Sequence, residues 1–117
     1  MIKLADGLQY EDVTVGTGAT AKTGDSVLVN YTGSLTDGTV FDSNIDPKFG
    51  HVQPFPFTIG GGQVIAGWDE GVAGMKVGGT RKLLIPANLA YGATPPPGAP
   101  IPPNAALDFT VTLVKIQ

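Results

Sequence analysis

The sequence has 117 residues, a net charge of −3 and a pI near 4.7; 42% of the residues are hydrophobic, 15% are charged and Cys is absent. This composition predicts one domain, residues 1–117, whose core needs no disulfide or metal. It argues against a nucleic-acid partner, which would require basic side chains to displace counterions. The lack of Cys excludes thiol nucleophiles and thiolate metal sites.

The chain carries no signal that would place it in or across a membrane. No apolar run is as long as a membrane span, and residues 1–7 lack the continuous apolar segment of a signal peptide. We therefore expect a cytoplasmic, monomeric protein without a membrane partner. The high content of Gly (17) and Pro (10), combined with the hydrophobic fraction, is typical of a turn-rich β domain rather than a disordered chain.

The N-terminal part of the chain is predicted to form strands joined by tight turns. Residues 8–15 and 26–32 are rich in β-branched and aromatic side chains and are followed by glycines. Asp37-Gly38 lies between short apolar segments and predicts a hairpin over residues 35–41. Residues 42–53 show no stable period, which favours a surface loop or bulge.

A short strand and a glycine turn are predicted next. Residues 55–59 read as a strand, and Pro54 and Pro56 place it at an edge or bulge. The three glycines at 60–62 do not predict a phosphate cradle, because no Lys-Ser/Thr pair follows them and the G-x-G-x-x-G spacing fails at Ile65. We expect a flexible turn that leads into the following segment.

Residues 63–75 are the only segment with a helical period, and they predict one short helix lying across a sheet. Its apolar stripe consists of Val64, Ile65, Trp68, Val72 and Met75. Each of its three glycines costs about 1 kcal/mol relative to Ala, so packing rather than propensity must hold the helix. Trp68, the only Trp, should form the floor of whatever the sheet encloses, or else be a core residue with no further role.

The C-terminal third predicts two more strands, residues 80–86 and 106–116, the second with apolar and polar residues in strict alternation. Residues 88–104 contain six of the ten prolines and predict a stiff loop. That loop is a rigid connection, a Pro-x-x-Pro ligand for an SH3-like groove, or the rim of a pocket. Together these elements predict an α+β fold: a twisted antiparallel sheet of about five strands around one short helix.

The residue types give little support to covalent or metal chemistry. His51 is the only His, lies in an irregular segment and has no partner at metal-ligand spacing. Asp69 and Glu70 are adjacent on a helix and diverge, which is typical of a solvated face. No Ser stands in a G-x-S-x-G motif. We expect neither a metal nor a cofactor, and what remains is a set of aromatic and aliphatic residues that forms either a core or an apolar pocket.

Six segments carry a more specific signal when they are taken together and in order. They are Val29-Asn30-Tyr31-Thr32-Gly33, Val40-Phe41-Asp42-Ser43, Val64-Ile65-Ala66-Gly67-Trp68-Asp69-Glu70-Gly71-Val72, Gly74-Met75-Lys76-Val77-Gly78-Gly79, Leu89-Ala90-Tyr91-Gly92 and Ile101-Pro102-Pro103-Asn104-Ala105. In this order they closely resemble the FKBP-type peptidyl-prolyl cis-trans isomerases, single-domain FK506-binding proteins. The resemblance runs over residues 8–116 and implies a half-barrel sheet around the helix.

The resemblance also implies a shallow apolar pocket with Trp68 as its floor. The residues implied to be catalytic are Tyr31, Phe41, Asp42, Tyr91 and Phe109. Those implied to bind substrate or ligand are Phe55, Phe57, Val64, Ile65, Trp68 and Ile101. By the same resemblance, the Tyr91 hydroxyl and the Ile65 N–H bind substrate carbonyls, and Asp42 is a polar acceptor ordered by Tyr31.

The function implied by the resemblance is acceleration of rotation about X-Pro bonds in peptides and unfolded proteins, with binding of the macrolides FK506 and rapamycin. A proline-binding or chaperone module without turnover is the alternative. The sequence departs from the family in two places. Residues 42–54 are longer than in the short members, with Lys48 as the nearest basic residue after Asp42, and Pro95-Pro96-Pro97 occupies a rim position where family members often carry Gly, His or an aromatic residue.

Overall fold

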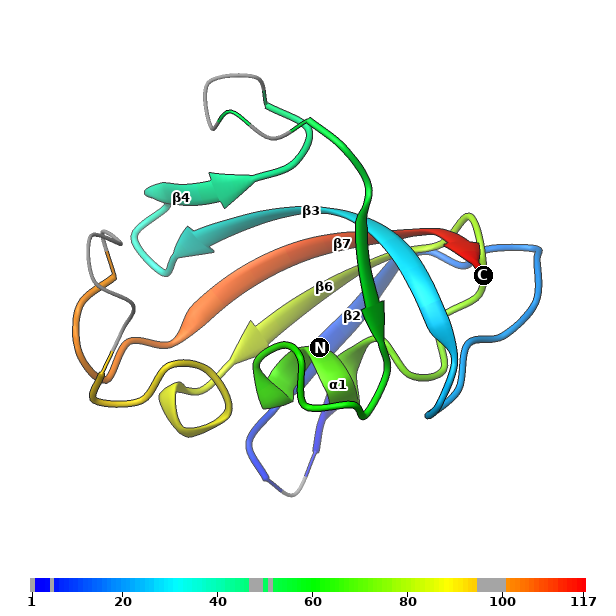
Figure 1. Ribbon diagram of the computed structural model, residues 1–117. Helices are drawn as coiled ribbons and strands as arrows, with labels where there is room; N and C mark the ends of the chain where they lie inside the picture. The colour runs from blue at the N-terminus through cyan, green and yellow to red at the C-terminus, as the bar shows by residue number, and fades with distance from the viewer. Residues whose placement is uncertain (1, 5, 47–49, 51, 95–100) are drawn as a thin grey trace.

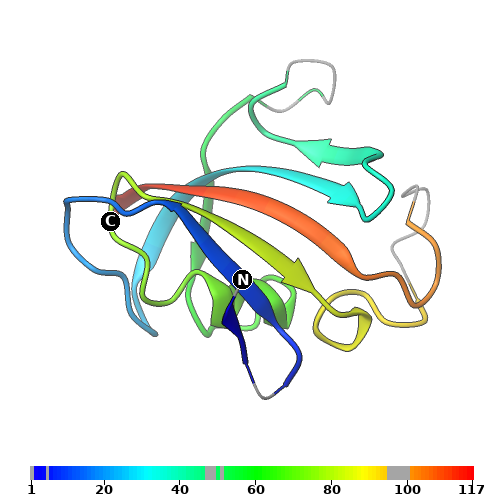
Figure 2. The same cartoon turned by 180° about the vertical axis from the view of Figure 1, so that it is seen from behind.

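The computed structural model describes residues 2–4, 6–46, 50, 52–94 and 101–117. Within these residues, seven strands form one antiparallel sheet in the order β1-β2-β6-β7-β3-β4, with β5 paired to β3. The strands are β1 Ile2–Lys3, β2 Gln9–Thr14, β3 Ser26–Leu35, β4 Val40–Ser43, β5 Phe55–Thr58, β6 Thr80–Ile85 and β7 Leu107–Ile116. The sheet curves around one short helix, α1 (Ala66–Gly71), which covers one face only (Figures 1 and 2).

The predicted fold class, an antiparallel sheet with one short helix, is confirmed, whereas the strand count is higher than expected. The two additional strands are short. β1 has two residues and pairs with β2, and β4 is the second arm of the predicted Asp37-Gly38 hairpin. Gly38 takes a φ of 95°, which only glycine adopts without strain.

The outer edge of β3 is shared by two strands. β4 pairs with Thr32–Ser34 and β5 pairs with residues 26–29 of β3, which leaves residues 30 and 31 between them. The chain leaves the sheet after β4 and returns at β5, so the predicted loop at 42–53 begins two residues later than expected (Figure 1). Both strands that border this gap contribute side chains to the concave face described below.

The helix is shorter than the predicted residues 63–75. Ile65 is still extended, with φ −60° and ψ 148°, and the helix ends at Gly71. The chain then turns at Gly74, whose φ is 90°. Two glycines set its distance from the sheet: a Cβ on Gly67 would lie 2.5 Å from Ile85 Cγ2, and one on Gly71 would lie 2.7 Å from Leu83 Cδ2. The helix backbone therefore lies directly on β6, and the face against the sheet includes these glycines besides Trp68.

The C-terminal end of α1 is fixed by Arg81 on β6, a buried cation with 8% exposure. Its guanidinium donates to the carboxylate of Asp12 on β2 and to the main-chain carbonyls of Gly71 and Ala73. It also lies 4.5 Å from the centroid of the Tyr10 ring. Because the last carbonyls of a helix have no partners within it, Arg81 satisfies groups that would otherwise be buried unpaired.

Several sequence-based expectations fall on parts of the chain outside the described residues. These are the solvated His51, the basic Lys48 and the proline run Pro95-Pro96-Pro97. The structure describes residues 88–94 and 101–104 of the proline-rich connection, and a 3-10 turn at Ala87–Leu89 stands at its start. Over the described part of the chain, no helix has the length and apolar character needed to cross a membrane.

Candidate active site

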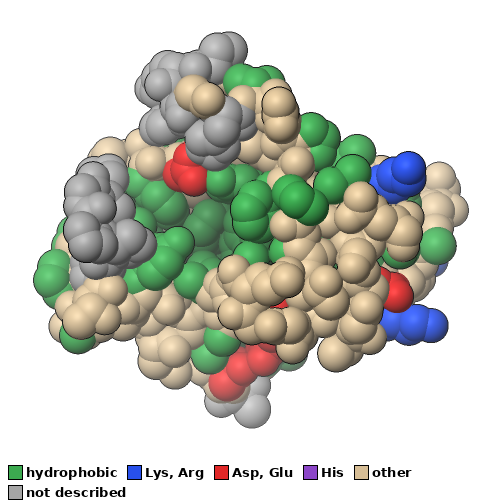
Figure 3. Space-filling view, viewed as in Figure 1, with side chains coloured by type: hydrophobic (Ala, Val, Ile, Leu, Met, Phe, Trp, Pro, Cys, Tyr) green, Lys and Arg blue, Asp and Glu red, His purple; other side chains and the backbone are tan. Residues whose placement is uncertain are grey.

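A cavity of about 230 Å³ opens on the concave side of the sheet, beside the N-terminal end of α1. Hydrophobic side chains line the hollow in the space-filling view (Figure 3). The cavity is lined by Tyr31, Phe41, Asp42, Phe55, Gln63, Val64, Ile65, Trp68, Tyr91 and Phe109. Four strands contribute to this lining: β3, β4, β5 and β7. The other residues come from α1, from the segment before it and from the connection that follows β6. The site therefore forms only when these elements are folded together.

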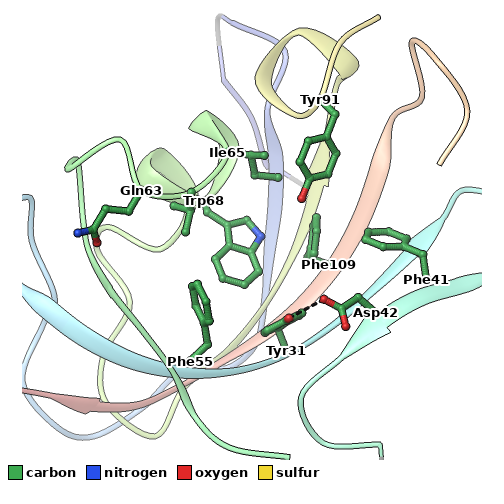
Figure 4. Close-up of a pocket in the computed structure, with 10 residues that line it drawn as sticks. Tyr31, Phe41, Asp42, Phe55, Gln63, Ile65, Trp68, Tyr91 and Phe109 are labelled. Atoms are coloured by element: carbon green, nitrogen blue, oxygen red, sulfur yellow. Dashed lines mark hydrogen bonds between the residues drawn. The ribbon is translucent and has the colours of Figure 1, made fainter. Parts of the chain in front are cut away.

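Trp68 forms the bottom of the cavity, surrounded by other rings (Figure 4). Its ring centroid lies 5.0 Å from that of Tyr31 and 5.2 Å from that of Phe109, both in edge-to-face geometry. Phe55 approaches it at 5.9 Å, also edge to face. Trp68 is only 4% exposed, yet it lines the opening, so the predicted floor lies under an open cup rather than sealed within the core. Such close edge-to-face packing fixes the shape of the cup before any ligand arrives.

One side of the cup is polar. The Tyr31 hydroxyl donates to Asp42 Oδ2 at 2.7 Å, and the main-chain N–H of Ser43 donates to Asp42 Oδ1 at 2.9 Å (Figure 4). Burial, and then the hydrogen bond to Asp42 and its charge, raise the pKa of Tyr31. Burial, followed by the charge of Asp42, also raises the pKa of Tyr91. Both phenols therefore keep their protons at neutral pH and act as hydrogen-bond donors at the edge of an apolar cavity.

The segment before α1 forms another part of the rim. The Ile65 N–H is not used by any main-chain hydrogen bond among the described residues, since the first helical bonds end on the Ile65 carbonyl instead. The turn before it is tied down by side chains. The Asp69 carboxylate accepts from the N–H groups of Gly60 and Gly62 at 2.9 and 3.2 Å. Asp69 thus holds the glycine turn at the rim, a role that its expected place on a solvated face did not include.

Nine of the eleven residues predicted for the site line this cavity, and two do not. Phe57 is 3% exposed and Ile101 is 7% exposed, and both belong to the hydrophobic core. The Phe57 ring lies 5.7 Å from that of Trp68, so it packs against the floor instead of forming a wall as expected. Because side chains alternate between the two faces of a strand, Phe55 and Phe57, two positions apart on β5, point to the same face. The twist of the strand decides which of the two rings reaches the cavity, and the residue pattern does not give that twist.

Sequence reasoning missed two residues near the site. Gln63 lines the rim, where its Oε1 accepts from the Thr58 N–H at 2.8 Å and its amide points away from the rings (Figure 4). Asn44, 2% exposed, lies behind Tyr31 and hydrogen-bonds to its main chain. Gln63 could have been found from its place just before the apolar stripe. Asn44 gave no signal, because Asn in an irregular segment is usually an exposed turn residue.

No group of three or more His, Cys, Asp or Glu side chains arranged to hold a metal ion occurs among the described residues. The residues that line the cavity carry two phenols, one carboxylate, the Gln63 carboxamide, the Trp68 indole N–H and the Ile65 main-chain N–H. Its volume is below the roughly 300–1,000 Å³ of sites for drug-sized ligands. The fold and the cavity therefore define a domain of one sheet and one helix, with an apolar cavity of the size of one small group.

Comparison with known proteins identifies the family. Residues 17–114 match the family described as FKBP-type peptidyl-prolyl cis-trans isomerase. The FK506-binding protein of Neisseria meningitidis serogroup B is 50% identical over 110 residues, which are 94% of this chain and 96% of that protein. The crystal structure of AtFKBP13 superimposes with a TM-score of 0.85 at 34% identity, covering 98% of this chain and 97% of that one. The chain belongs to the FKBP-type peptidyl-prolyl cis-trans isomerase family, as its resemblance predicted.

Other relatives are longer proteins. FK506-binding protein 4 of Dictyostelium discoideum is 53% identical over 117 residues, which are 98% of this chain but 30% of that protein. FK506-binding protein 4 of Neurospora crassa is 53% identical over 116 residues, which are 23% of that protein. The chain thus spans less than a third of these two relatives. In FkpA from Escherichia coli the match covers 51% of the chain in the crystal structure, with a TM-score of 0.84 and 42% identity.

Proposed function

We propose that this chain is an active isomerase that accelerates cis-trans rotation about X-Pro bonds in peptides and unfolded proteins, with the prolyl ring seated on Trp68. The observation that carries the proposal is the open aromatic cup of about 230 Å³ above that indole. A cavity of this size, lined mainly by rings, fits one residue of a peptide better than a large rigid ligand in full. Membership in a family of isomerases supports the same proposal.

The reaction needs no covalent step, because the barrier lies in the amide itself. An X-Pro bond resists rotation by about 18–20 kcal/mol, since the planar form has partial double-bond character. That planar form is also the more charge-separated one, so water stabilises it more than it stabilises the twisted form. Transfer into a dry aromatic cup removes this preference, and each 1.36 kcal/mol gained at the transition state is about tenfold in rate. A gain of roughly 5–6 kcal/mol would suffice for a useful isomerase.

The polar groups at the rim would hold the peptide while the bond turns. The Ile65 N–H and the Tyr91 hydroxyl are donors for substrate carbonyls. Asp42, held by Tyr31 at 2.7 Å, is the negative group nearest the rotating amide. Tyr31, Phe41 and Phe109 present their ring edges to the substrate carbonyl. These contacts fix one end of the peptide, so that rotation occurs about a single bond.

The same cavity is the proposed site for FK506 and rapamycin, which would place a proline-like ring on Trp68 and use the Ile65 N–H, Tyr91 and Asp42 as polar contacts. Support comes from the names of the relatives, which are FK506-binding proteins. The expected result is a rise in thermal stability. A ligand at 100 times its Kd adds about 2.7 kcal/mol to the free energy of unfolding, so the absence of any shift at saturation would oppose this part of the proposal.

A protease-coupled assay on a short X-Pro peptide tests the main proposal. Cleavage of the trans form alone makes the cis-to-trans rate visible, and the measurement is repeated with several residues before the proline. The expected result is a rate that rises linearly with enzyme concentration and falls when FK506 is added. A protein that binds the peptide, seen by Trp68 fluorescence, but leaves the rate at the uncatalysed value would support the proline-binding or chaperone module instead.

A further inference from the structure

The outer edge of β3 has a break directly behind the candidate active site. The pairing of β5 ends at Val29 and that of β4 starts at Thr32, so none of the strands in the described parts of the chain covers Tyr31 on this side. In an antiparallel strand, the N–H and C=O groups of alternate residues point to the same edge. The main-chain groups of Tyr31 and the carbonyl of Val29 therefore face the break, and buried groups of this kind must find other partners.

Asn44 supplies these partners, from main chain and side chain together. Its N–H donates to the Tyr31 carbonyl at 3.1 Å, and its Oδ1 accepts from the Tyr31 N–H at 2.6 Å. Its Nδ2 donates to the carbonyls of Val29 and Gln53, both at 2.9 Å. Asn44 is 2% exposed, so water does not compete for these bonds. The oxygen and both hydrogens of one carboxamide are used, a combination that no carboxylate, hydroxyl or alkyl side chain offers.

These contacts connect Asn44 to the polar side of the cup. Asn44 follows Asp42 by two residues, and Asp42 is the acceptor of the Tyr31 hydroxyl. Tyr31 is thus held twice by the same short segment, at its main chain by Asn44 and at its side chain by Asp42. β4 itself is a weak support, because it pairs with β3 at only three positions with an irregularity among them. Besides this pairing, the Thr32 and Ser43 hydroxyls join the two strands at 3.0 Å, and the Asn44 contacts hold the main chain of Tyr31 itself.

The contact with Gln53 adds a second consequence. Residues 44 and 53 lie at the two ends of the segment that leaves the sheet between β4 and β5, and the carboxamide joins these ends. Asn44 itself does not line the cavity.

We propose that Asn44 is a positioning residue: its carboxamide closes the break in the edge of β3 and so sets the Tyr31–Asp42 pair from behind the cavity, without touching the peptide. The catalytic part of this inference rests on the proposed isomerase function. The structural part, that the Tyr31 hydroxyl bond to Asp42 requires Asn44, stands independently of turnover.

The test compares N44A with N30A. Asn30 is a matched control because it lies on the same strand, is only partly buried and borders the same outer surface hollow as Asn44. Two quantities are measured at a temperature where each protein is folded: the slowly exchanging Tyr31 hydroxyl proton by NMR, assigned with Y31F, and kcat/KM in the wild-type and Y31F backgrounds. If N44A does not fold, N44S replaces it under the same criteria.

The expected result is that N44A loses the hydroxyl signal and lowers kcat/KM about fivefold, while the same substitution in the Y31F background changes kcat/KM by less than about 1.5-fold. N30A should change neither quantity. A preserved hydroxyl signal in N44A, or an equal loss of kcat/KM in both backgrounds, overturns the inference, since a purely structural residue would give that pattern. An inactive wild-type protein would refute the proposed function instead, and the hydroxyl signal would still decide the role of Asn44.

Discussion

The Arg81 guanidinium lies with its Nε 2.7 Å from Asp12 Oδ1, and its Nη1 donates to the Gly71 carbonyl at the end of α1 at 3.0 Å. A single side chain thus joins β2, β6 and the helix that carries Trp68. Arg81 is nearly buried, whereas the Asp12 side chain is 35% exposed. Loss of the bonds to the helix-end carbonyls should therefore cost more stability than loss of the ion pair, which water partly screens.

Arg81→Met should destabilise the protein strongly, because it leaves the carbonyls of Gly71 and Ala73 without donors and Asp12 without its partner. We expect a loss of about 2–4 kcal/mol in the free energy of unfolding, measured by urea titration. Lys82→Met is the matched control: Lys82 is the exposed neighbour on the same strand, and its change should stay within about 0.5 kcal/mol. Equal effects of the two substitutions would mean that the Arg81 contacts contribute nothing.

Gly67→Ala should also destabilise the protein, although Ala is the better helix former by about 1 kcal/mol. The added Cβ would meet Ile85 Cγ2 at 2.5 Å and Ile85 Cδ1 at 2.8 Å, so the helix must move away from β6. We expect a net loss of about 1–3 kcal/mol by thermal or urea unfolding. In an Ile85→Ala background the new methyl fills the vacated space, so the same substitution should become neutral or stabilising. A loss that is unchanged in that background would contradict the steric explanation.

The positions of most strands along the chain were predictable because they depend on local patterns, whereas their order in the sheet was not predicted. The Asp37-Gly38 hairpin and the alternation along β7 each express a rule that acts over a few residues, and both were confirmed. The length of the helix was not predictable in this way. The prediction of 63–75 used the spacing of apolar side chains alone, whereas Gly67 and Gly71 are the residues that bring the helix backbone against the sheet.

Some residues at and near the candidate site could likewise be named from sequence, and others could not. Four of the rings that line the cavity, those of Tyr31, Phe41, Trp68 and Tyr91, belong to the segments that resemble one family. Phe55 and Phe109 lie outside those segments but within residues 8–116, over which the resemblance runs, so they too could be named from sequence. Asn44 and Arg81 could not, because each acts through hydrogen bonds to groups that are distant in the chain. Arg81 reaches the Gly71 carbonyl over 10 positions and the Asp12 carboxylate over 69, and Asn44 reaches the Val29 carbonyl over 15. Main-chain partners leave no pattern in residue types, so a polar residue that satisfies them looks like any surface residue until the fold is known.

The pair Asp6 and Glu70 should give stability an unusual pH dependence. The hydrogen bond to Asp6, then burial and the charge of Asp6, raise the pKa of Glu70 from 4.5 to about 7. Bonds from Glu70 and from the Leu8 N–H lower the pKa of Asp6. Between about pH 4.5 and pH 7 the folded protein keeps a proton on Glu70 that the unfolded chain has lost, so the free energy of unfolding should fall as pH rises through this window.

Glu70→Gln tests this assignment, because Gln can donate to Asp6 at every pH. The decline in stability between about pH 5 and pH 7 should flatten in this variant, and the difference between the two proteins cancels the contributions of titrating groups that do not interact with Glu70. Urea unfolding at closely spaced pH values is the measurement. Parallel curves for the wild type and Glu70→Gln would show that the two carboxyl groups do not share a proton.

Asp42→Ala should lower activity with little change in fold. Asp42 is partly buried at the edge of the cup, and its removal frees the Tyr31 hydroxyl without opening the core. We expect kcat/KM for an X-Pro peptide to fall about tenfold, equivalent to 1.4 kcal/mol of transition-state stabilisation, while the urea midpoint changes only slightly. Asp37→Ala removes an exposed carboxylate at the hairpin turn and controls for the loss of one negative charge.

Because Asp42 also contributes to the raised pKa of Tyr91, the alkaline titration of Tyr91 should begin at lower pH in Asp42→Ala than in Asp37→Ala. Full activity in Asp42→Ala, together with an unchanged titration, would remove Asp42 from the proposed mechanism and leave desolvation by the rings as its only source of rate.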